Sequence, residues 1–570
     1  MDDASEPPPD EEITRQAEPD GLAGRETRKA ASGSSGLQDT TNVATADAVQ
    51  GEVRDFIRAH EQRRTQFPRA ILVGCLAGGA GTLFRYCLDV VEKLRTSLVD
   101  TLHHHGDWTI VIPMAVAGIL AGVAVGLVRK FAPEASGSGI PHVKAVILHL
   151  REMRWRRLIP VKFIGGVAGI GAGLALGREG PTIQIGGAIG QLVSEMLKVN
   201  PRERQTLVAA GAGAGLAAAF NAPLAGMVFV LEEVQRDFTP TVFAAALVAS
   251  VMADVVTRSL AGQQPVFSIK DVSTPPLTLL PAFLVLGFAA GLLGVVYNRG
   301  LLMSLDLFQR GRRIPGWDKG VLVGILAGAV VWLLPNAAGG GYPILAETFS
   351  GQLGIGAILG FFVLRFALTM LSYGCGAPGG IFAPLLVLGA LLGLATGEGV
   401  HWLFPRMDFY PAAFAVVGMG AYFSAIVRAP LTGIVLMLEM TGHYGQMLPL
   451  ILACALAYGV ADWLGDRPVY EALLERDLLR SQHVPELTET LLVDVSVESG
   501  APFVGKEVKD LGLPGGCILI TVHRGIHDQV PTAVTVIEAG DRLTAVISPA
   551  AVEAAALLRK GVTRSMEHDY

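Results

Sequence analysis

Charged residues are scarce in this sequence. Only 17% of its 570 residues are Asp, Glu, Lys or Arg, whereas 51% are hydrophobic. The mean hydropathy is +0.46. Soluble globular domains carry about 25% charged residues, so this deficit indicates a membrane protein.

Paired cysteines are missing too. The five cysteines are scattered and form no CxxC pair, so we expect neither a disulfide framework nor a cysteine metal site. His103, His104 and His105 are adjacent, but they fall in an exposed-looking stretch between apolar segments, and we expect no metal there. No nucleophile–base set stands out in the apolar region. We therefore expect no enzyme, no cofactor and no nucleic-acid partner.

The first residues lack the basic-then-apolar pattern of a signal peptide, and we expect none. They are rich in Asp, Glu, Pro, Ser and Gly, which predicts a disordered segment over residues 1–55. Arg63, Arg64 and Arg69 precede the first apolar segment, which favours a cytoplasmic N-terminus.

Long uninterrupted apolar runs are few. Apolar segments recur over residues 71–464, but several are shorter than the roughly 20 residues that span a bilayer. Many are interrupted by glycine and proline, a pattern typical of transporters and channels. We expect an all-α polytopic membrane domain of tilted, broken helices over residues 56–480.

Four landmarks of the first half return in the second in the same order. GSGIP is followed by GREGP, by glycines five and nine residues beyond the GREGP proline, and by NAPLAGMVFVLEE. Their counterparts are GGGYP, GIFAP, the same two glycines and RAPLTGIVLMLEM, at closely similar spacings. The pattern predicts two structural repeats, residues 69–262 and 276–480, with a site at their interface near the membrane midplane.

Several landmarks also have the chemistry of a helix start, with flexible glycines and then a proline ahead of an apolar run. A helix start leaves N–H groups without partners and carries positive partial charge, so starts buried together favour an anion. Arg178 and Glu179 of GREGP lie at one such start. Two interpretations stay open: an ion pair near the membrane surface, or an acid where an anion belongs.

GSGIP, GREGP and GGIFAP, in this order and spacing, resemble the three signature segments of the CLC chloride channel and transporter family. The resemblance covers residues 69–479. It implies two inverted repeats and a homodimer with one anion pathway per subunit. It also implies a multi-pass protein of the cell's inner membrane with both termini in the cytoplasm.

The resemblance further implies which groups bind chloride: the Ser138 hydroxyl, the backbone amides of Ile381 and Phe382, and the Tyr470 phenol. Two simpler interpretations compete. Ser138 could cap a helix, and Tyr470 could be an aromatic residue at the membrane interface.

Two acids match the family's functional glutamates. Glu179 matches the gating glutamate, and Glu233 matches the internal proton-transfer glutamate of the exchangers, where channels usually carry an apolar residue. Lys162 and Arg178 would add positive potential along the pathway. The alternative for Glu233 is a solvated helix end that it shares with Glu232.

The chain changes character after residue 480. Short alternating β-branched runs separated by Gly-containing turns predict a small, mostly β, α/β domain over residues 485–560. The order of its segments resembles the RCK_C (TrkA-C) ligand-binding subdomain, which implies a regulatory small molecule such as a nucleotide. The alternative is a domain that serves only dimerisation.

Together these patterns predict chloride/proton antiport gated by a protonatable glutamate. One alternative is a passive voltage- or pH-gated chloride channel. Another is a ligand sensor that signals through the C-terminal domain.

Overall fold

The structure is a computed structural model that describes residues 35–563, with gaps at 264–274, 311–315, 351–352, 408, 481–490, 526, 549–550 and 552. Of the segment expected to be disordered (1–55), residues 1–34 lie outside the described residues. From Ser35 onward the backbone is helical, as the first part of α1. This differs from the expectation for residues 35–55, where Ala, Gln and Glu favour helix.

The membrane domain is built from helices alone, in the described part of the chain. Its helices are α1 (Ser35–His103), α2 (Val111–Phe131), α3 (Ile140–Ile147), α4 (Trp155–Gly171), α5 (Glu179–Met196), α6 (Pro201–Phe220), α7 (Pro223–Phe229), α8 (Pro240–Ala261), α9 (Leu280–Arg310), α10 (Gly316–Leu333), α11 (Tyr342–Ser350), α12 (Ile355–Gly374), α13 (Phe382–Leu403), α14 (Ala413–Val427), α15 (Pro430–Thr441), α16 (Met447–Trp463) and α17 (Val469–Arg480).

Seven helical stretches among the described residues are long and apolar enough to cross a membrane. They are Gln66–His103, Asp107–Phe131, Pro240–Ala261, Leu277–Arg310, Ile355–Gly374, Phe382–Leu403 and Tyr444–Trp463. Others are too short to span: α3 has 8 residues and α11 has 9, against the roughly 20 that a bilayer requires. The expected mixture of spanning and broken helices is present.

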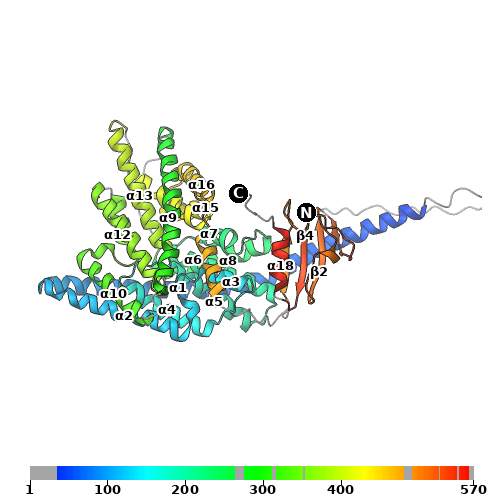
Figure 1. Cartoon of the computed structure of the whole chain (residues 1–570), viewed down its shortest axis with the longest axis horizontal. Coiled ribbons are helices and arrows are strands. Elements are labelled where there is room, and N and C mark those ends of the chain that lie inside the picture. The colour runs from blue at the N-terminus through cyan, green and yellow to red at the C-terminus, as the bar shows by residue number, and fades with distance from the viewer. Residues whose placement is uncertain are drawn as a thin grey trace, which may run out of the picture. The chain divides into compact units, whose positions relative to one another are not determined.

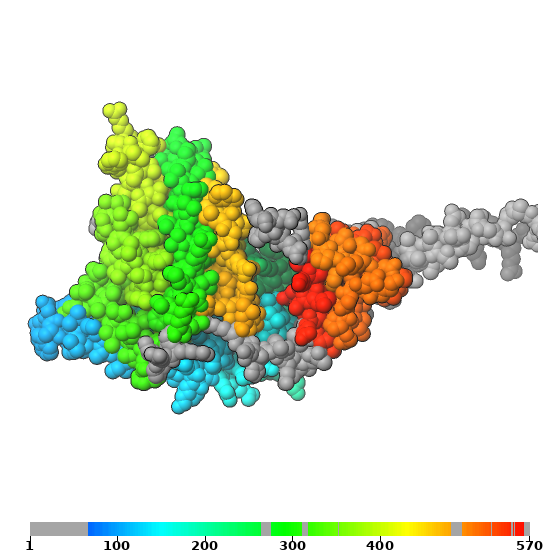
Figure 2. Space-filling view, viewed as in Figure 1, coloured from blue at the N-terminus to red at the C-terminus, as the bar shows by residue number. Residues whose placement is uncertain are grey.

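The helix order repeats. A long helix α2, a short α3 and a packed pair α5–α6 are matched by α10, α11 and the packed pair α13–α14. The repeats contact each other where α2 packs on α10 and where α7 packs on α15. Figure 1 shows these helices, and Figure 2 shows α9 along one face with α16 beside it.

The repeated glycines are explained by close helix packing. A Cβ on Gly186 of α5 would lie 2.1 Å from the carbonyl oxygen of Gly211 on α6. At the equivalent place in the second repeat, a Cβ on Gly389 of α13 would lie 2.6 Å from the carbonyl oxygen of Gly418 on α14. Small residues allow membrane helices to approach this closely, so only glycine fits at both crossings.

Two glutamates join the repeats reciprocally. The Glu232 carboxylate accepts the N–H groups of Leu431 (3.0 Å) and Thr432 (2.7 Å) at the start of α15. The Glu439 carboxylate, at the matching position of the second repeat, accepts two N–H groups at the start of α7. Each acid therefore neutralises the positive end of the other repeat's helix.

The C-terminal domain is a four-stranded antiparallel sheet in the order β1-β4-β2-β3, with helix α18 (Glu553–Val562) packed on β1. Its strands are β1 (Leu491–Ser496), β2 (Cys517–Arg524), β3 (His527–Gln529) and β4 (Arg542–Ile547). The buried core draws only on residues between 493 and 562. The domain therefore closes its own core. Figure 1 shows β2, β4 and α18 of this domain.

Candidate functional site

Backbone hydrogen bonds bring the three signature segments together. The Gly137 N–H donates to the Ala377 carbonyl (3.2 Å), and the Gly379 N–H donates to the Gly137 carbonyl (3.0 Å). Gly177 and Gly380 exchange two more bonds, of 2.7 and 2.8 Å. The segments that lead into α3, α5 and α13, from both repeats, are thereby fixed side by side.

Gly180 makes the tightest of these contacts. A Cβ there would lie 2.7 Å from the Ser138 carbonyl oxygen and 2.8 Å from the Gly380 Cα atom. Any larger residue would push the three segments apart, so the fourth residue of GREGP must be glycine.

Ser138 and Tyr470 both bury a hydroxyl group inside the membrane domain. Each side chain is fully buried, and neither hydroxyl has a hydrogen-bond partner among the described residues. A buried hydroxyl without a partner costs about 1–3 kcal/mol, and both groups can donate to a dehydrated anion. Chloride fits this donor set.

The competing interpretations of the two residues fail. The residue that precedes α3 is Gly139, and among the described residues no side chain caps that helix start. Ser138 therefore does not act as a cap, and its N–H contacts the Tyr373 hydroxyl at 3.4 Å. Tyr470 lies on α17, which packs on α3, and a fully buried phenol is not an interfacial aromatic residue.

Ile381 and Phe382 form the start of α13. Both are fully buried, and Phe382 is the first helical residue. The first N–H groups of a helix have no intrahelical partner and carry positive partial charge. The expected backbone donors therefore lie beside the bonded pair Gly177–Gly380.

Glu179 is the first residue of α5 and is fully buried. The hydroxyl of Tyr342 donates to its Oε1 atom at 2.6 Å. The backbone N–H groups of Glu179 and Ala383, at the starts of α5 and α13, also face this carboxylate. The acid therefore occupies a buried position where two helix starts favour negative charge.

Arg178 points toward a cavity beside this carboxylate. Its guanidinium group lies 4.7 Å from the centre of the Tyr342 ring. Both side chains line a cavity of about 220 Å³ together with Arg85, Asp89 and Glu92 of α1. Arg178 is thus part of the wall near Glu179.

Lys162 is fully buried and contacts the loop that carries Ser138. Its Nζ atom donates to the carbonyl oxygens of Ala135 (2.9 Å) and Gly137 (2.6 Å). Arg365 does the same in the second repeat, donating to three carbonyls of the segment before α11. The sequence analysis missed Arg365, although its position after GGGYP matches that of Lys162 after GSGIP.

Glu233 is fully buried in a π-helical turn, η3 (Val230–Val234), that follows α7. Its Oε1 atom accepts from the Lys144 Nζ atom at 2.7 Å, and Arg236 lies 3.8 Å from Oε2. The solvated helix-end interpretation is therefore wrong for Glu233. The sequence analysis also missed Lys144, although an ionisable residue in a short apolar helix is itself a signal.

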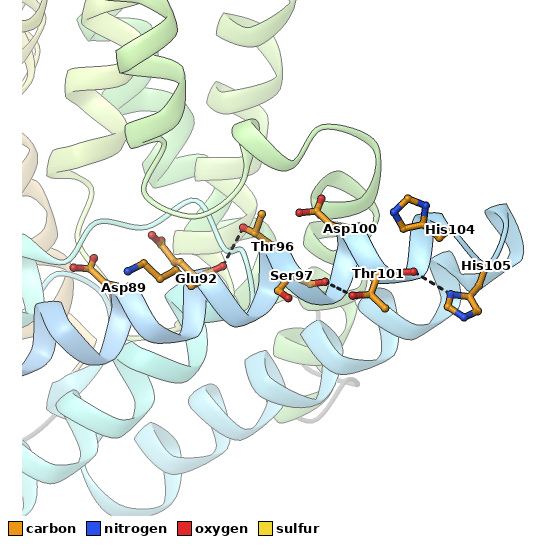
Figure 3. A pocket seen from close by; sticks show the side chains of 9 residues that line it. Asp89, Glu92, Thr96, Ser97, Asp100, Thr101, His104 and His105 are labelled. Carbon is orange, nitrogen blue, oxygen red and sulfur yellow. Dashed lines mark hydrogen bonds between the residues drawn. The ribbon is translucent and has the colours of Figure 1, made fainter.

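A shallow hollow follows one side of α1. It is lined by Asp89, Glu92, Lys93, Thr96, Ser97, Asp100, Thr101, His104 and His105. Figure 3 shows Thr96, Thr101 and His105 bonded to carbonyl oxygens one turn earlier rather than converging on a point. Across the described residues no group of three or more His, Cys, Asp or Glu could hold a metal ion.

Fold and site together define a class: a polytopic membrane protein in which broken helices of two repeats meet around buried hydroxyl and amide donors. The family profile described as "Voltage gated chloride channel" matches residues 120–462. The chain belongs to this family. A second profile, the TrkA-C domain, matches residues 492–559.

Curated relatives match most of the chain. The chain is 41% identical over 453 residues to the "H(+)/Cl(-) exchange transporter ClcA" of Salmonella typhimurium, and equally to that of Salmonella newport. The alignment covers 78% of this chain and 96% of each relative.

Solved structures of membrane transporters share the fold of this chain. The fold matches that of a slow cyanobacterial Cl-/H+ antiporter with a TM-score of 0.70 and 36% identity, covering 73% of this chain and 99% of that one. A eukaryotic CLC transporter shares the fold at a TM-score of 0.62 and 24% identity, covering 77% of this chain and 79% of that chain. The predicted family, the all-helical membrane domain and the small C-terminal sheet domain are confirmed.

Proposed function

We propose that the protein exchanges chloride for protons across a membrane. The observation that carries this proposal is the pair of buried hydroxyls, Ser138 and Tyr470, which have no hydrogen-bond partner among the described residues. Hydroxyl and amide donors replace part of the water shell of an anion without holding it as tightly as a full positive charge would. We assign chloride binding to Ser138, Tyr470 and the amides of Ile381 and Phe382.

Glu179 gates this pathway. Its ionised carboxylate competes with chloride for the positive ends of α5 and α13 and blocks anion movement. When it takes up a proton, its charge is lost, the helix starts attract it less, and it leaves the pathway. One side chain therefore links anion movement to proton movement.

Glu233 supplies protons from the other side. It is a buried carboxyl that is paired with Lys144. This pairing favours the exchanger over a passive channel, because a channel has no need of a buried proton carrier. In a channel, chloride flux would not drive protons uphill.

The test is a proteoliposome assay that follows chloride and pH together. The wild type should move protons uphill when chloride flows down its gradient. Glu179→Ala should give chloride flux that is insensitive to pH and carries no protons, and Glu233→Gln should keep chloride flux but lose proton transport.

Glu398→Gln is the matched control, because Glu398 lies on α13 about 24 Å from its first residue at 1.5 Å per residue. It should retain coupling. Proton transport that survives in Glu179→Ala would contradict the assignment of the gate. Wild-type chloride flux without proton movement would select the channel.

We also propose that the protein is a homodimer in the inner membrane with both termini in the cytoplasm. The family membership supports the dimer, and the arginines ahead of the first apolar segment support the orientation. Light scattering in detergent measures the subunit number. Proteolysis of the C-terminal domain in inside-out vesicles tests the orientation.

The C-terminal domain regulates the exchanger, on this proposal, by binding a nucleotide. The TrkA-C match and the separate core support a distinct module. Nucleotides should raise the melting temperature of isolated residues 485–563. Deleting residues 481–570 should leave chloride flux intact, whereas loss of flux would favour the ligand sensor. If no nucleotide binds and the deletion changes nothing, the domain is structural.

A further inference from the structure

Tyr342 contacts the gate from the second repeat. It is the tyrosine of GGGYP and the first residue of α11, and its hydroxyl donates to Glu179 Oε1 at 2.6 Å. The equivalent residue of GSGIP is Ile140, which has no hydroxyl. This donor therefore exists in one repeat only and faces one carboxylate.

The tyrosine ring is held in place independently of its hydroxyl. The Arg178 guanidinium group stacks on it at 4.7 Å, and a contact of this kind between a cation and an aromatic ring is attractive. The ring also forms part of the wall of the cavity of about 220 Å³ beside Glu179. Removing only the hydroxyl should leave ring and wall in place.

We infer that Tyr342 is a positioning residue that latches ionised Glu179 in the anion pathway and so sets the pH range of exchange. This inference rests on the gating role proposed for Glu179. A hydrogen bond to an ionised carboxylate is stronger than one to a neutral acid. The latch therefore favours the closed, charged state and weakens once the acid is protonated.

Other charged and titratable groups surround the same carboxylate. They are Arg178, which directly precedes α5, and Tyr470 on α17. Arg85, Asp89 and Glu92 on α1 line the cavity together with Tyr342 and Arg178. Tyr342→Phe leaves all of them unchanged. A shift in the pH dependence of flux in this variant would therefore report the hydroxyl alone.

The experiment measures chloride flux from proteoliposomes across roughly pH 4 to pH 8, a range that brackets carboxyl titration. Flux should rise as the pH falls. In Tyr342→Phe the midpoint of this curve should move about one pH unit upward, as expected for the loss of one hydrogen bond to a charged group. Proton coupling should persist, because Glu179 is still present.

Tyr410→Phe is the matched control. Its hydroxyl donates to the Phe349 carbonyl at 3.0 Å, and its loss should leave the midpoint unchanged. In a Glu179→Gln background, Tyr342→Phe should also have no effect on the pH dependence.

An unchanged midpoint in Tyr342→Phe overturns the latch, as does a shift that persists without Glu179. If the wild type moves chloride but no protons, the proposed chloride/proton exchange is contradicted, and not the role of Tyr342. In that case the comparison of pH midpoints between the wild type and Tyr342→Phe still tests whether Tyr342 holds ionised Glu179 in place, because a gate can respond to pH without transporting protons.

Discussion

At the residue scale, the candidate anion site uses neutral donors. Ser138 and Tyr470 offer hydroxyls, and the buried cation Lys162 is occupied by two backbone carbonyls of the loop before α3. A transported ion must bind well enough to enter and weakly enough to leave. Lys162 therefore fixes the loop, and we expect it to add positive potential without contacting the anion directly.

Ser138→Ala removes one of these donors. We expect the ratio of chloride to nitrate flux to fall about fivefold, because one neutral hydrogen bond is worth about 1 kcal/mol and chloride is the more strongly hydrated anion. Anion-exchange assays in proteoliposomes measure the ratio. Ser424→Ala, which loses a buried hydroxyl bonded to the Gly420 carbonyl, should not change it. A fall of the same size in that control would show a general packing effect.

Lys144 and Glu233 form a buried ion pair with side chains only 6% and 0% exposed. Removing one partner leaves an uncompensated charge, so Lys144→Met should destabilise the protein by about 3–5 kcal/mol. The double variant Lys144→Met/Glu233→Gln should recover most of this loss. Thermal unfolding in detergent measures both variants.

The exposed pair Arg467–Glu475, with side chains 69% and 52% exposed, is the control for that comparison. Arg467→Met should cost no more than about 1 kcal/mol. Equal losses in Lys144→Met and in the double variant would show that the lysine contributes by packing rather than by charge.

At the scale of elements, the site depends on helix ends held in register by backbone contacts. The hydrogen bonds between Gly177 and Gly380 join the starts of α5 and α13. Glu232 of the first repeat binds the start of α15, and Glu439 of the second repeat binds the start of α7. The glycines that allow α13 to contact α14 determine where the start of α13 lies. A change in helix packing far from the donors should therefore reach the site.

Gly393→Ala and Gly399→Ala, both on α13, test whether close helix packing requires glycine. A Cβ at Gly393 would lie 2.0 Å from a backbone oxygen, whereas a Cβ at Gly399 has nothing within 4 Å. We expect Gly393→Ala to lower stability by about 1–3 kcal/mol, since rigid backbone must move. Gly399→Ala should stabilise by about 0.5–1 kcal/mol through helix propensity. Melting temperatures that fall equally in both variants would contradict the packing argument.

At the scale of the whole molecule, the C-terminal domain has its own core and its own buried charge. Asp541 is fully buried, and Arg524 donates to both of its oxygens, at 2.8 and 2.7 Å. Burial alone would raise the pKa of Asp541. The hydrogen bonds from Arg524 and from the Glu538 N–H outweigh it, so the pKa lies below its usual value.

Because the pKa of Asp541 is lower in the folded domain, its stabilising effect is complete above the unfolded value of about 3.9 and is lost as pH falls through the folded value. The melting temperature of isolated residues 485–563 should therefore drop below about pH 4. Asp541→Asn should lower it at neutral pH and flatten this dependence. The exposed Asp510→Asn should do neither, and a wild-type profile in Asp541→Asn would contradict the assignment.

The family, the two repeats and most of the candidate site residues could be predicted from the sequence. This was possible because each landmark is a local requirement of the backbone: a glycine where chains approach, a proline where a helix begins, a serine or a glutamate at a fixed offset. The roles assigned to Ser138, Ile381, Phe382, Tyr470, Glu179 and Glu233 stay predictions until flux is measured.

Only the tertiary structure decided which charged groups are partners. Glu232 and Glu233 are adjacent in the chain, yet one accepts the N–H groups of α15 and the other is buried against Lys144. The bond from Tyr342 to Glu179 likewise joins residues that are 163 positions apart. Such pairs depend on the packing of helices that are far apart in the sequence, and a local pattern of residues does not predict that packing.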